Sequence, residues 1–568
     1  MKIIHQLLAA LLLLFFVIAC NQESKKSEDR AMTLTEIKLE QPKENRPPPP
    51  APQQNATDYQ SPKIVNDNET TSIEVISQEG VKDVALAPEK AKEDFNTEDY
   101  DFIIENKFLT AIKDPLSTFS IDVDEASYSN VRRYLENGSL PPAGAVRIEE
   151  MINYFDYVYP KPQNGEPFTV NTEISDCPWN PQHRLVHIGL QGKEIPVENL
   201  PTSNMVFLID VSGSMDEPNK LPLVQASLNM LVDQLREKDR VAIVVYAGSA
   251  GLVLPSTSGS DKIKIKEAIN ELQAGGSTAG GEGIQLAYKV ARDNFIIDGN
   301  NRIILATDGD FNVGVSNDDE LVRLIEEERK AGVFLSVLGY GMGNYKDSKM
   351  QQLADKGNGN HSYIDNINEA RKVLVTEFGS TLFTIAKDVK IQIEFNPLKV
   401  QAYRLIGYEN RMLAAEDFND DKKDAGELGS GHTVTALYEV IPAGVKDTFI
   451  KSVDPLKYQF NNGEIADESS PEIMTIKLRY KEPAGETSKL IQHPVIDSHL
   501  PLASTSENFR FSASVAEFGM LLRNSEYKQQ SSFSHVVSLA KAAKGKDDNG
   551  YRSEFVRLVE SATSMAKR

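Results

Sequence analysis

Short apolar runs alternate with amphipathic segments between residues 201 and 385. Leu221, Val224, Leu228 and Leu231 recur at the spacing of one helix face, which predicts a helix after the first run. Apolar strands that alternate with helices are typical of a mainly parallel sheet covered on both faces. We therefore predict a doubly wound α/β domain at residues 201–385. Its expected strands are Met205–Ile209, Val241–Tyr246, Arg302–Ala306, Val333–Leu338 and His361–Ile364.

The segments on either side of this domain follow different patterns. Residues 98–200 predict two helices, Glu125–Asn137 and Val146–Tyr154, followed by strands. Residues 386–500 predict antiparallel strands separated by turns rich in Gly, Asp and Asn, which favours a β-sandwich, and residues 501–568 return to helix. Because strands precede the α/β domain and resume after it, we expect this domain to be inserted into one sandwich built from both flanks.

The N-terminus is typical of an export signal. The apolar run Leu7–Ala19 follows a lysine and a histidine and ends at Cys20. The last residues of the run resemble the bacterial lipobox, in which the cysteine receives lipid, so we expect residues 1–19 to be a lipoprotein signal peptide and Cys20 the lipidation site. An uncleaved signal anchor is the alternative, although the run is shorter than the about 20 residues that span a bilayer. Asn21 follows the cysteine, and the absence of Asp at this position favours the outer membrane by resemblance to known sorting rules, so we expect a lipid-anchored protein of the cell envelope at that membrane.

Residues 20–97 are expected to form a disordered tether. Large apolar residues are few there, so the segment cannot bury enough surface to fold. Pro47–Pro50 and Pro52 make part of it a semi-rigid spacer. The prolines either act only as a spacer that lengthens the tether or are recognised by a partner, and the sequence leaves both alternatives open.

Composition and charge narrow the classes of function. Hydrophobic content of 40% and charged content of 25% are those of a soluble globular protein. The formal net charge of −22 argues against nucleic acid as a partner, because phosphate binding needs a basic face. Only two cysteines are present, so no disulfide scaffold is expected, and Cys177 is interpreted as a packing residue.

Oxygen-bearing side chains gather where strands of the predicted sheet end. Asp210, Ser212 and Ser214 follow the first strand, Thr278 precedes a helix, and Asp308 follows the third strand. Ligands of open α/β sheets collect beyond the carboxyl ends of the strands. Carboxylates and hydroxyls suit Mg²⁺, Mn²⁺ or Ca²⁺ better than Zn²⁺. The alternative is that Asp210 and Ser212 only cap a helix.

These five residues resemble the metal-ion-dependent adhesion site of von Willebrand factor type A domains. The resemblance implies that Ser212, Ser214 and Thr278 contribute hydroxyl oxygens to one divalent cation, with Mg²⁺ the first expectation. It implies that Asp210 and Asp308 bind the cation directly or through water. It also implies that an acidic side chain of a protein partner completes the coordination sphere.

The flanking segments resemble a narrower group, the bacterial A-domain lipoproteins with a dedicated N-terminal segment and a separate C-terminal region. The resemblance covers nearly all of the chain after about residue 98 and implies architecture and metal binding, but no reaction. The segments that carry it are Ser117–Ser129, Glu149–Phe155, Asp308–Gly314 and Gly431–Tyr438.

Three classes of function are weighed on these observations. The leading hypothesis is a membrane-anchored, divalent-metal-dependent protein-binding lipoprotein that serves adhesion or scaffolding. A hydrolase is disfavoured, because His-Glu-x-x-His, Gly-x-Ser-x-Gly and Walker motifs are absent and His361 and His432 are interpreted as packing or surface residues. We therefore do not expect an enzyme. A subunit of an envelope assembly or chaperone complex is the alternative, which shares the metal chemistry and differs in its partner.

Overall fold

The computed structural model describes residues 97–121, 124–163, 165–276, 280–309, 318–379, 383–450, 469–483 and 485–567. The predicted signal peptide, Cys20, most of the tether and the candidate ligand Thr278 lie outside these residues. Within the described ranges, no helix is both long enough and apolar enough to cross a membrane.

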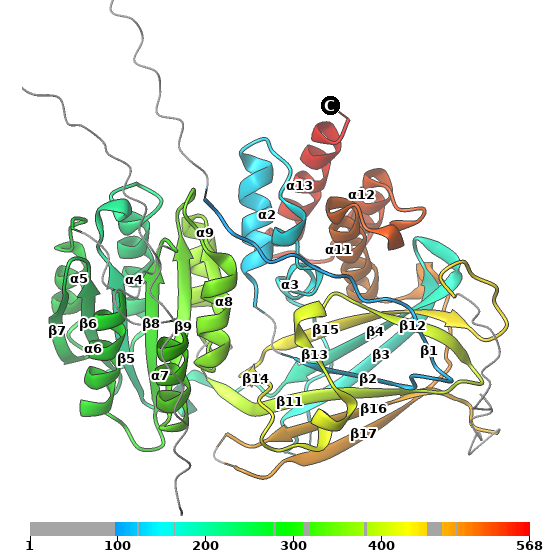
Figure 1. Cartoon of the computed structure of the whole chain (residues 1–568), viewed down its shortest axis with the longest axis horizontal. Coiled ribbons are helices and arrows are strands. Elements are labelled where there is room, and N and C mark those ends of the chain that lie inside the picture. The colour runs from blue at the N-terminus through cyan, green and yellow to red at the C-terminus, as the bar shows by residue number, and fades with distance from the viewer. Residues whose placement is uncertain are drawn as a thin grey trace, which may run out of the picture. The chain divides into compact units, whose positions relative to one another are not determined.

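The α/β domain is built on a six-stranded sheet in the order β10-β9-β8-β5-β6-β7 (Figure 1). All neighbouring strands are parallel except β7, which pairs antiparallel with β6 at the edge. The predicted doubly wound, mainly parallel sheet is thus confirmed. Its strands are β5 (Ser203–Asp210), β6 (Arg240–Tyr246), β7 (Ala250–Ser258), β8 (Asn300–Thr307), β9 (Val333–Tyr340) and β10 (His361–Ile364).

Helices cover both faces of this sheet because successive strand residues point to opposite sides. Along β5, Met205, Phe207 and Ile209 belong to one apolar core, whereas Val206 and Leu208 belong to the other. The first core contains residues of α4, α5 and α9, and the second contains residues of α6, α7 and α8. The helices are α4 (Leu221–Gln234), α5 (Lys262–Asn270), α6 (Gly280–Asp293), α7 (Asp318–Lys330), α8 (Asp347–Lys356) and α9 (Ile367–Arg371), with a π-helical turn at Lys372–Thr376.

A β-sandwich combines strands from both sides of the α/β domain in the sequence. One sheet has the order β1-β12-β15-β4-β3, and the other has the order β13-β2-β11-β16-β17 with β14 paired to β11. The strands that precede the α/β domain are β1 (Leu109–Thr110), β2 (Leu116–Ser120), β3 (Phe168–Cys177) and β4 (Asn180–Gly192). Those that follow it are β11 (Thr384–Phe395), β12 (Val400–Ile406), β13 (Met412–Leu413), β14 (Gly426–Gly429), β15 (Thr433–Pro442), β16 (Glu472–Lys481) and β17 (Lys489–Ile496).

The two flanks are hydrogen-bonded to each other throughout this sandwich. β4 pairs with β15 over eight residue pairs, and β2 pairs with β11 over five. One apolar core lies between the sheets and contains Phe119 and Val186 from the first flank with Ile391 and Ile476 from the second. The expectation that the α/β domain is inserted into a single sandwich is therefore confirmed.

The remaining helices form one cluster although they lie far apart in the sequence. Its apolar core contains Met151 and Trp179 from the N-terminal flank, Phe518 and Phe555 from the C-terminal helices, and Leu437 of β15. The helices predicted at each end of the chain thus share one core, which also packs on the sandwich. They are α2 (Ala126–Glu136), α3 (Ile148–Asn153), α11 (Glu507–Arg523), α12 (Phe533–Ala542) and α13 (Tyr551–Met565).

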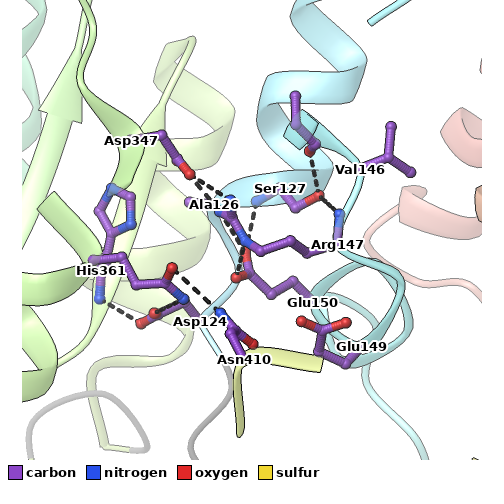
Figure 2. Close-up of polar contacts among 12 residues, drawn as sticks. Asp124, Ala126, Ser127, Val146, Arg147, Glu149, Glu150, Asp347, His361 and Asn410 are labelled. Carbon is purple, nitrogen blue, oxygen red and sulfur yellow. Dashed lines mark hydrogen bonds and ion pairs between the residues drawn. The ribbon is translucent and has the colours of Figure 1, made fainter. Parts of the chain in front are cut away.

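Buried ion pairs join this helical cluster to the α/β domain. The Arg147 guanidinium, just before α3, binds the carboxylates of Asp347 in α8 and Glu150 in α3 (Figure 2). In α2, Arg132 donates to Asp365 at 2.5 Å. All of these side chains are nearly excluded from water. Removing one partner of a pair would therefore leave a buried charge without compensation.

Candidate metal centre

The sheet brings Asp210 and Asp308 to the same edge. Asp210 is the last residue of β5, and Asp308 directly follows the last residue of β8. These strands are parallel neighbours in which Ile209 lies opposite Ala306. Both carboxylates therefore lie beyond the carboxyl ends of adjacent strands, as the sequence predicts.

Hydrogen bonds fix the orientation of the buried Asp210 carboxylate. Its Oδ1 accepts from the backbone N–H of Ser212 at 2.9 Å, which folds the following loop back over the strand end. Its Oδ2 accepts from the hydroxyls of Tyr246 at 3.0 Å and Thr307 at 3.2 Å. Burial raises the pKa of Asp210 to about 6, and the charge of Asp308 acts in the same direction.

The two candidate serine ligands converge next to this carboxylate. The hydroxyl oxygens of Ser212 and Ser214 lie 3.1 Å apart, and the Ser214 side chain is hydrogen-bonded to Asp308. The turn Gly213–Met215, which includes Ser214, is anchored by Met215, which is fully buried. Four of the five predicted residues are thus brought together.

The fifth candidate, Thr278, lies outside the described residues, but the loop that leads to it is held at this site. The Gly275 N–H donates to the Val211 carbonyl at 2.7 Å, and the Gly213 N–H donates to the Gly276 carbonyl at 3.1 Å. Gly276 has a φ of +88°, a conformation that favours glycine. The first two loops of the predicted constellation are therefore in direct backbone contact.

Lys220 is a component of the site that the sequence analysis did not identify. Its Nζ donates to Oδ2 of Asp308 at 3.0 Å and to the Asn344 side chain at 3.4 Å. Burial alone would raise the pKa of Asp308, but hydrogen bonding to Asn344 and the charge of Lys220 hold it below its ordinary value. Asp308 is therefore charged and is already paired with a cation of the protein itself.

Lys220 gives one sequence signal of this role, its place directly before a predicted helix. It is the N-cap residue of α4, where a positive charge opposes the helix dipole. A lysine there is only 4% exposed, which requires a carboxylate partner. Gly341 makes room for the stem, because a Cβ at that position would lie 2.5 Å from the Lys220 Cε.

The donor set of this centre consists of oxygens alone: the carboxylates of Asp210 and Asp308 and the hydroxyls of Ser212 and Ser214. The described residues contain no cluster of three or more His, Cys, Asp or Glu side chains suited to a metal ion. The hydroxyl-rich chemistry fits a hard cation such as Mg²⁺ rather than a nitrogen- and sulfur-ligated one.

Comparison with known proteins identifies the family. Family models match residues 94–187 ("von Willebrand factor"), 204–375 ("von Willebrand factor type A domain") and 380–565 ("Uncharacterized protein YfbK, C-terminal"). The Escherichia coli protein named "Uncharacterized protein YfbK" is 46% identical over 468 residues, which cover 81% of this chain and 80% of that one. The chain belongs to the YfbK family of von Willebrand factor type A domain proteins.

More distant similarities fall on parts of the YfbK-family chain. The Synechocystis protein sll0103 is 29% identical over 187 residues, which are 33% of this chain and 43% of that one. Mouse inter alpha-trypsin inhibitor heavy chain 4 is 27% identical over 185 residues, which cover 30% of this chain and 19% of that protein.

Solved structures include similar folds at low identity. A von Willebrand factor type A protein from Catenulispora acidiphila is 15% identical, with a TM-score of 0.38, and the match covers 68% of this chain and 89% of that one. Proximal thread matrix protein 1 from the mussel byssus, described with a zinc-occupied MIDAS motif, is 24% identical, with a TM-score of 0.26 over 31% of this chain and 44% of that one.

Proposed function

We propose that this YfbK-family protein binds one divalent cation, Mg²⁺ first, at Asp210, Ser212, Ser214, Thr278 and Asp308, and through it an acidic side chain of a protein partner. In this proposal the chain is held at the cell envelope by lipid on Cys20, at the outer membrane. Type A domains commonly bind a divalent metal and often mediate metal-dependent protein interaction, which agrees with the family match.

The proximity of the two serine hydroxyls to each other, and of Ser214 to Asp308, carries the proposal. Ser212 and Ser214 lie 3.1 Å apart, and Ser214 contacts Asp308, although these residues come from two different strand ends. A helix cap would involve only Asp210 and Ser212, and it would not account for the position of Asp308 next to Ser214. The contact between strand ends therefore favours a cation site over simple capping.

The number of protein oxygens supports a partner ligand. Mg²⁺ requires octahedral coordination and usually keeps waters or ligand oxygens besides those of the protein. The exposed Ser214 faces solvent, so the outer side of the cation would be open to a carboxylate from another protein. Binding rather than catalysis is proposed, because the buried His361 is engaged with the hydroxyl of Tyr345 at 2.7 Å.

Titration of the whole chain with MgCl₂ and MnCl₂ by isothermal calorimetry tests the metal step. Wild type should bind one equivalent, and Asp308→Asn should lose at least about tenfold in affinity, because a neutral amide replaces a charged ligand. Asp216→Asn is the matched control, since Asp216 is an exposed carboxylate just after the same loop. Equal Mg²⁺ binding by wild type and Asp308→Asn would refute the site.

The partner step needs a separate measurement. Envelope proteins captured by wild type in MgCl₂ should be released by EDTA and should be absent with Asp308→Asn, whereas Asp216→Asn should retain them. A partner set that is indifferent to both EDTA and Asp308→Asn would overturn metal-dependent recognition even if the cation itself binds.

A further inference from the structure

A second candidate site is a pocket whose lining residues do not belong to the metal-binding loops. It contains about 840 Å³ of open space, mouth included, and is lined by the extended segment 101–104 and by residues of α3, α8 and the turn Glu409–Arg411. Glu149 of α3 lines this pocket, as do Phe102 and Ile104 of the extended segment.

The carboxylate of Glu149 is buried without a hydrogen-bond partner on Oε2 among the described residues. The side chain of Glu149 is only 2% exposed. Figure 2 shows the contrast with its neighbour Glu150, which contacts Arg147 and accepts from the N–H of Ser127 at 2.9 Å, whereas Glu149 has no contact with the other residues drawn. An unsatisfied buried acceptor costs about 1–3 kcal/mol, and more when it is charged. A ligand that donates a hydrogen bond to Glu149 would recover this free energy.

The arginine side chains near Glu149 already bind other groups. Arg523 donates to Glu409 at 2.7 Å and to the Val146 carbonyl at 2.5 Å. Arg147 is shared between Glu150 and Asp347. Burial and the charge of Glu409 raise the pKa of Glu149 to about 7, although the charge of Arg523 acts in the opposite direction.

The lining of the pocket favours a cation with an apolar stem. Four carboxylates line it, those of Asp101, Glu149, Asp347 and Glu409, against one guanidinium, that of Arg147. Phe102 and Ile104 on the extended segment are 89% and 72% exposed, which is unusual for two large apolar side chains so close together. A methylene chain would cover such side chains while its charged end reaches a carboxylate.

We propose that this pocket binds a lysine or arginine side chain of a protein partner, with the cationic head at Glu149 and the methylene stem against Phe102 and Ile104. The pocket is a second binding site, and its function does not depend on the proposed metal centre. The formal net charge of −22 favours approach of a basic partner to the chain as a whole.

Ligand binding to the whole chain tests this proposal with two probes, n-butylguanidinium chloride and the peptide acetyl-Ala-Arg-Ala-amide. Saturation-transfer NMR titrations should detect saturable binding of both, with the peptide at least as tight as the small cation. Butanol and butyrate, which share the stem and lack the positive charge, should not bind detectably. Binding of butanol as tight as that of butylguanidinium, or exclusion of the peptide, would overturn the proposal.

Substitutions locate the site. Glu149→Gln keeps the shape and removes the charge, so it should weaken both probes by at least tenfold, whereas Glu271→Gln at an exposed position of α5's end should not. Phe102→Ala changes a side chain exposed to water, so it should leave the melting temperature unchanged and weaken both probes severalfold. Full affinity in both Glu149→Gln and Phe102→Ala would refute the site.

The two proposals fail separately. Asp210→Ala should abolish Mg²⁺ binding and leave butylguanidinium binding unchanged, and Glu149→Gln should do the reverse. Loss of probe binding in Asp210→Ala would contradict an independent second site.

Discussion

Replacing Lys220 with methionine should strengthen Mg²⁺ binding at the candidate metal centre. The Lys220 Nζ lies 3.0 Å from Oδ2 of Asp308. Because a Mg–O bond is about 2.1 Å long, a cation held by that oxygen would lie within about 5 Å of the ammonium. Repulsion between charges of +2 and +1 at that distance is about 2 kcal/mol in the dielectric of water and about 7 kcal/mol at an effective constant of about 20.

We take the lower of these values, because the flexible stem of a lysine lets the ammonium move towards water. A change of about 2 kcal/mol corresponds to Mg²⁺ binding on the order of tenfold tighter or more. Without metal the effect on stability should have the opposite sign. Asp308 would lose a buried counter-ion, which costs roughly 3–5 kcal/mol when the remaining charge stays buried.

Two measurements on the same variant separate these effects. Calorimetric titration with MgCl₂ gives the affinity, and thermal unfolding across MgCl₂ concentrations gives the stability without metal and the stabilisation by it. Lys264→Met is the control, since Lys264 is exposed on α5. Mg²⁺ binding by Lys220→Met that is equal to or weaker than that of wild type would show that the ammonium does not oppose the cation.

Three further outcomes follow from the fold. Arg147→Met should lower the free energy of unfolding in urea by roughly 3–5 kcal/mol, because it leaves the buried Asp347 carboxylate without its partner; a change below about 1 kcal/mol would contradict this. Residues 386–500 expressed alone should show no cooperative urea transition, because their strands lack those of the first flank. For His183, burial lowers the pKa, but hydrogen bonding to Glu439 raises it above 6.5 on balance, so its contribution to stability is full below pH 6.5 and is lost as pH rises through the folded value. The urea midpoint of wild type should therefore fall more steeply, as pH rises above 6.5, than that of His183→Gln.

The sequence predicts best the elements whose burial is periodic. The alternation along β5 divides its side chains between two cores, and that regularity is visible in the apolar run itself. The edge strand β7 is not predicted, because Leu252 and Val253 are both more than 40% exposed and Pro255 interrupts the run.

The candidate metal centre is predictable to the extent that it depends on strand ends. Asp210 and Asp308 each follow an apolar strand, so their proximity follows from the order of a parallel sheet. Lys220 is not predictable in this way, because its contact with Asp308 depends on the path of the loop before α4. The role of Glu149 is equally unpredictable from the sequence, because its carboxylate lacks a partner only as a result of how α3 packs against the other flank.

The interleaved sandwich has a consequence for how the protein is made. β2 and β4 leave the ribosome about 250 residues before β11 and β15, their respective hydrogen-bonded neighbours in the later flank. Until those later strands arrive, the early ones have open edges and apolar faces that invite aggregation. The intervening α/β domain contains its own two cores and can fold first, so we expect the sandwich to form only after this domain has been synthesised. Such long-range pairing is slow, and we expect any chaperone that handles the nascent chain to act on β2–β4.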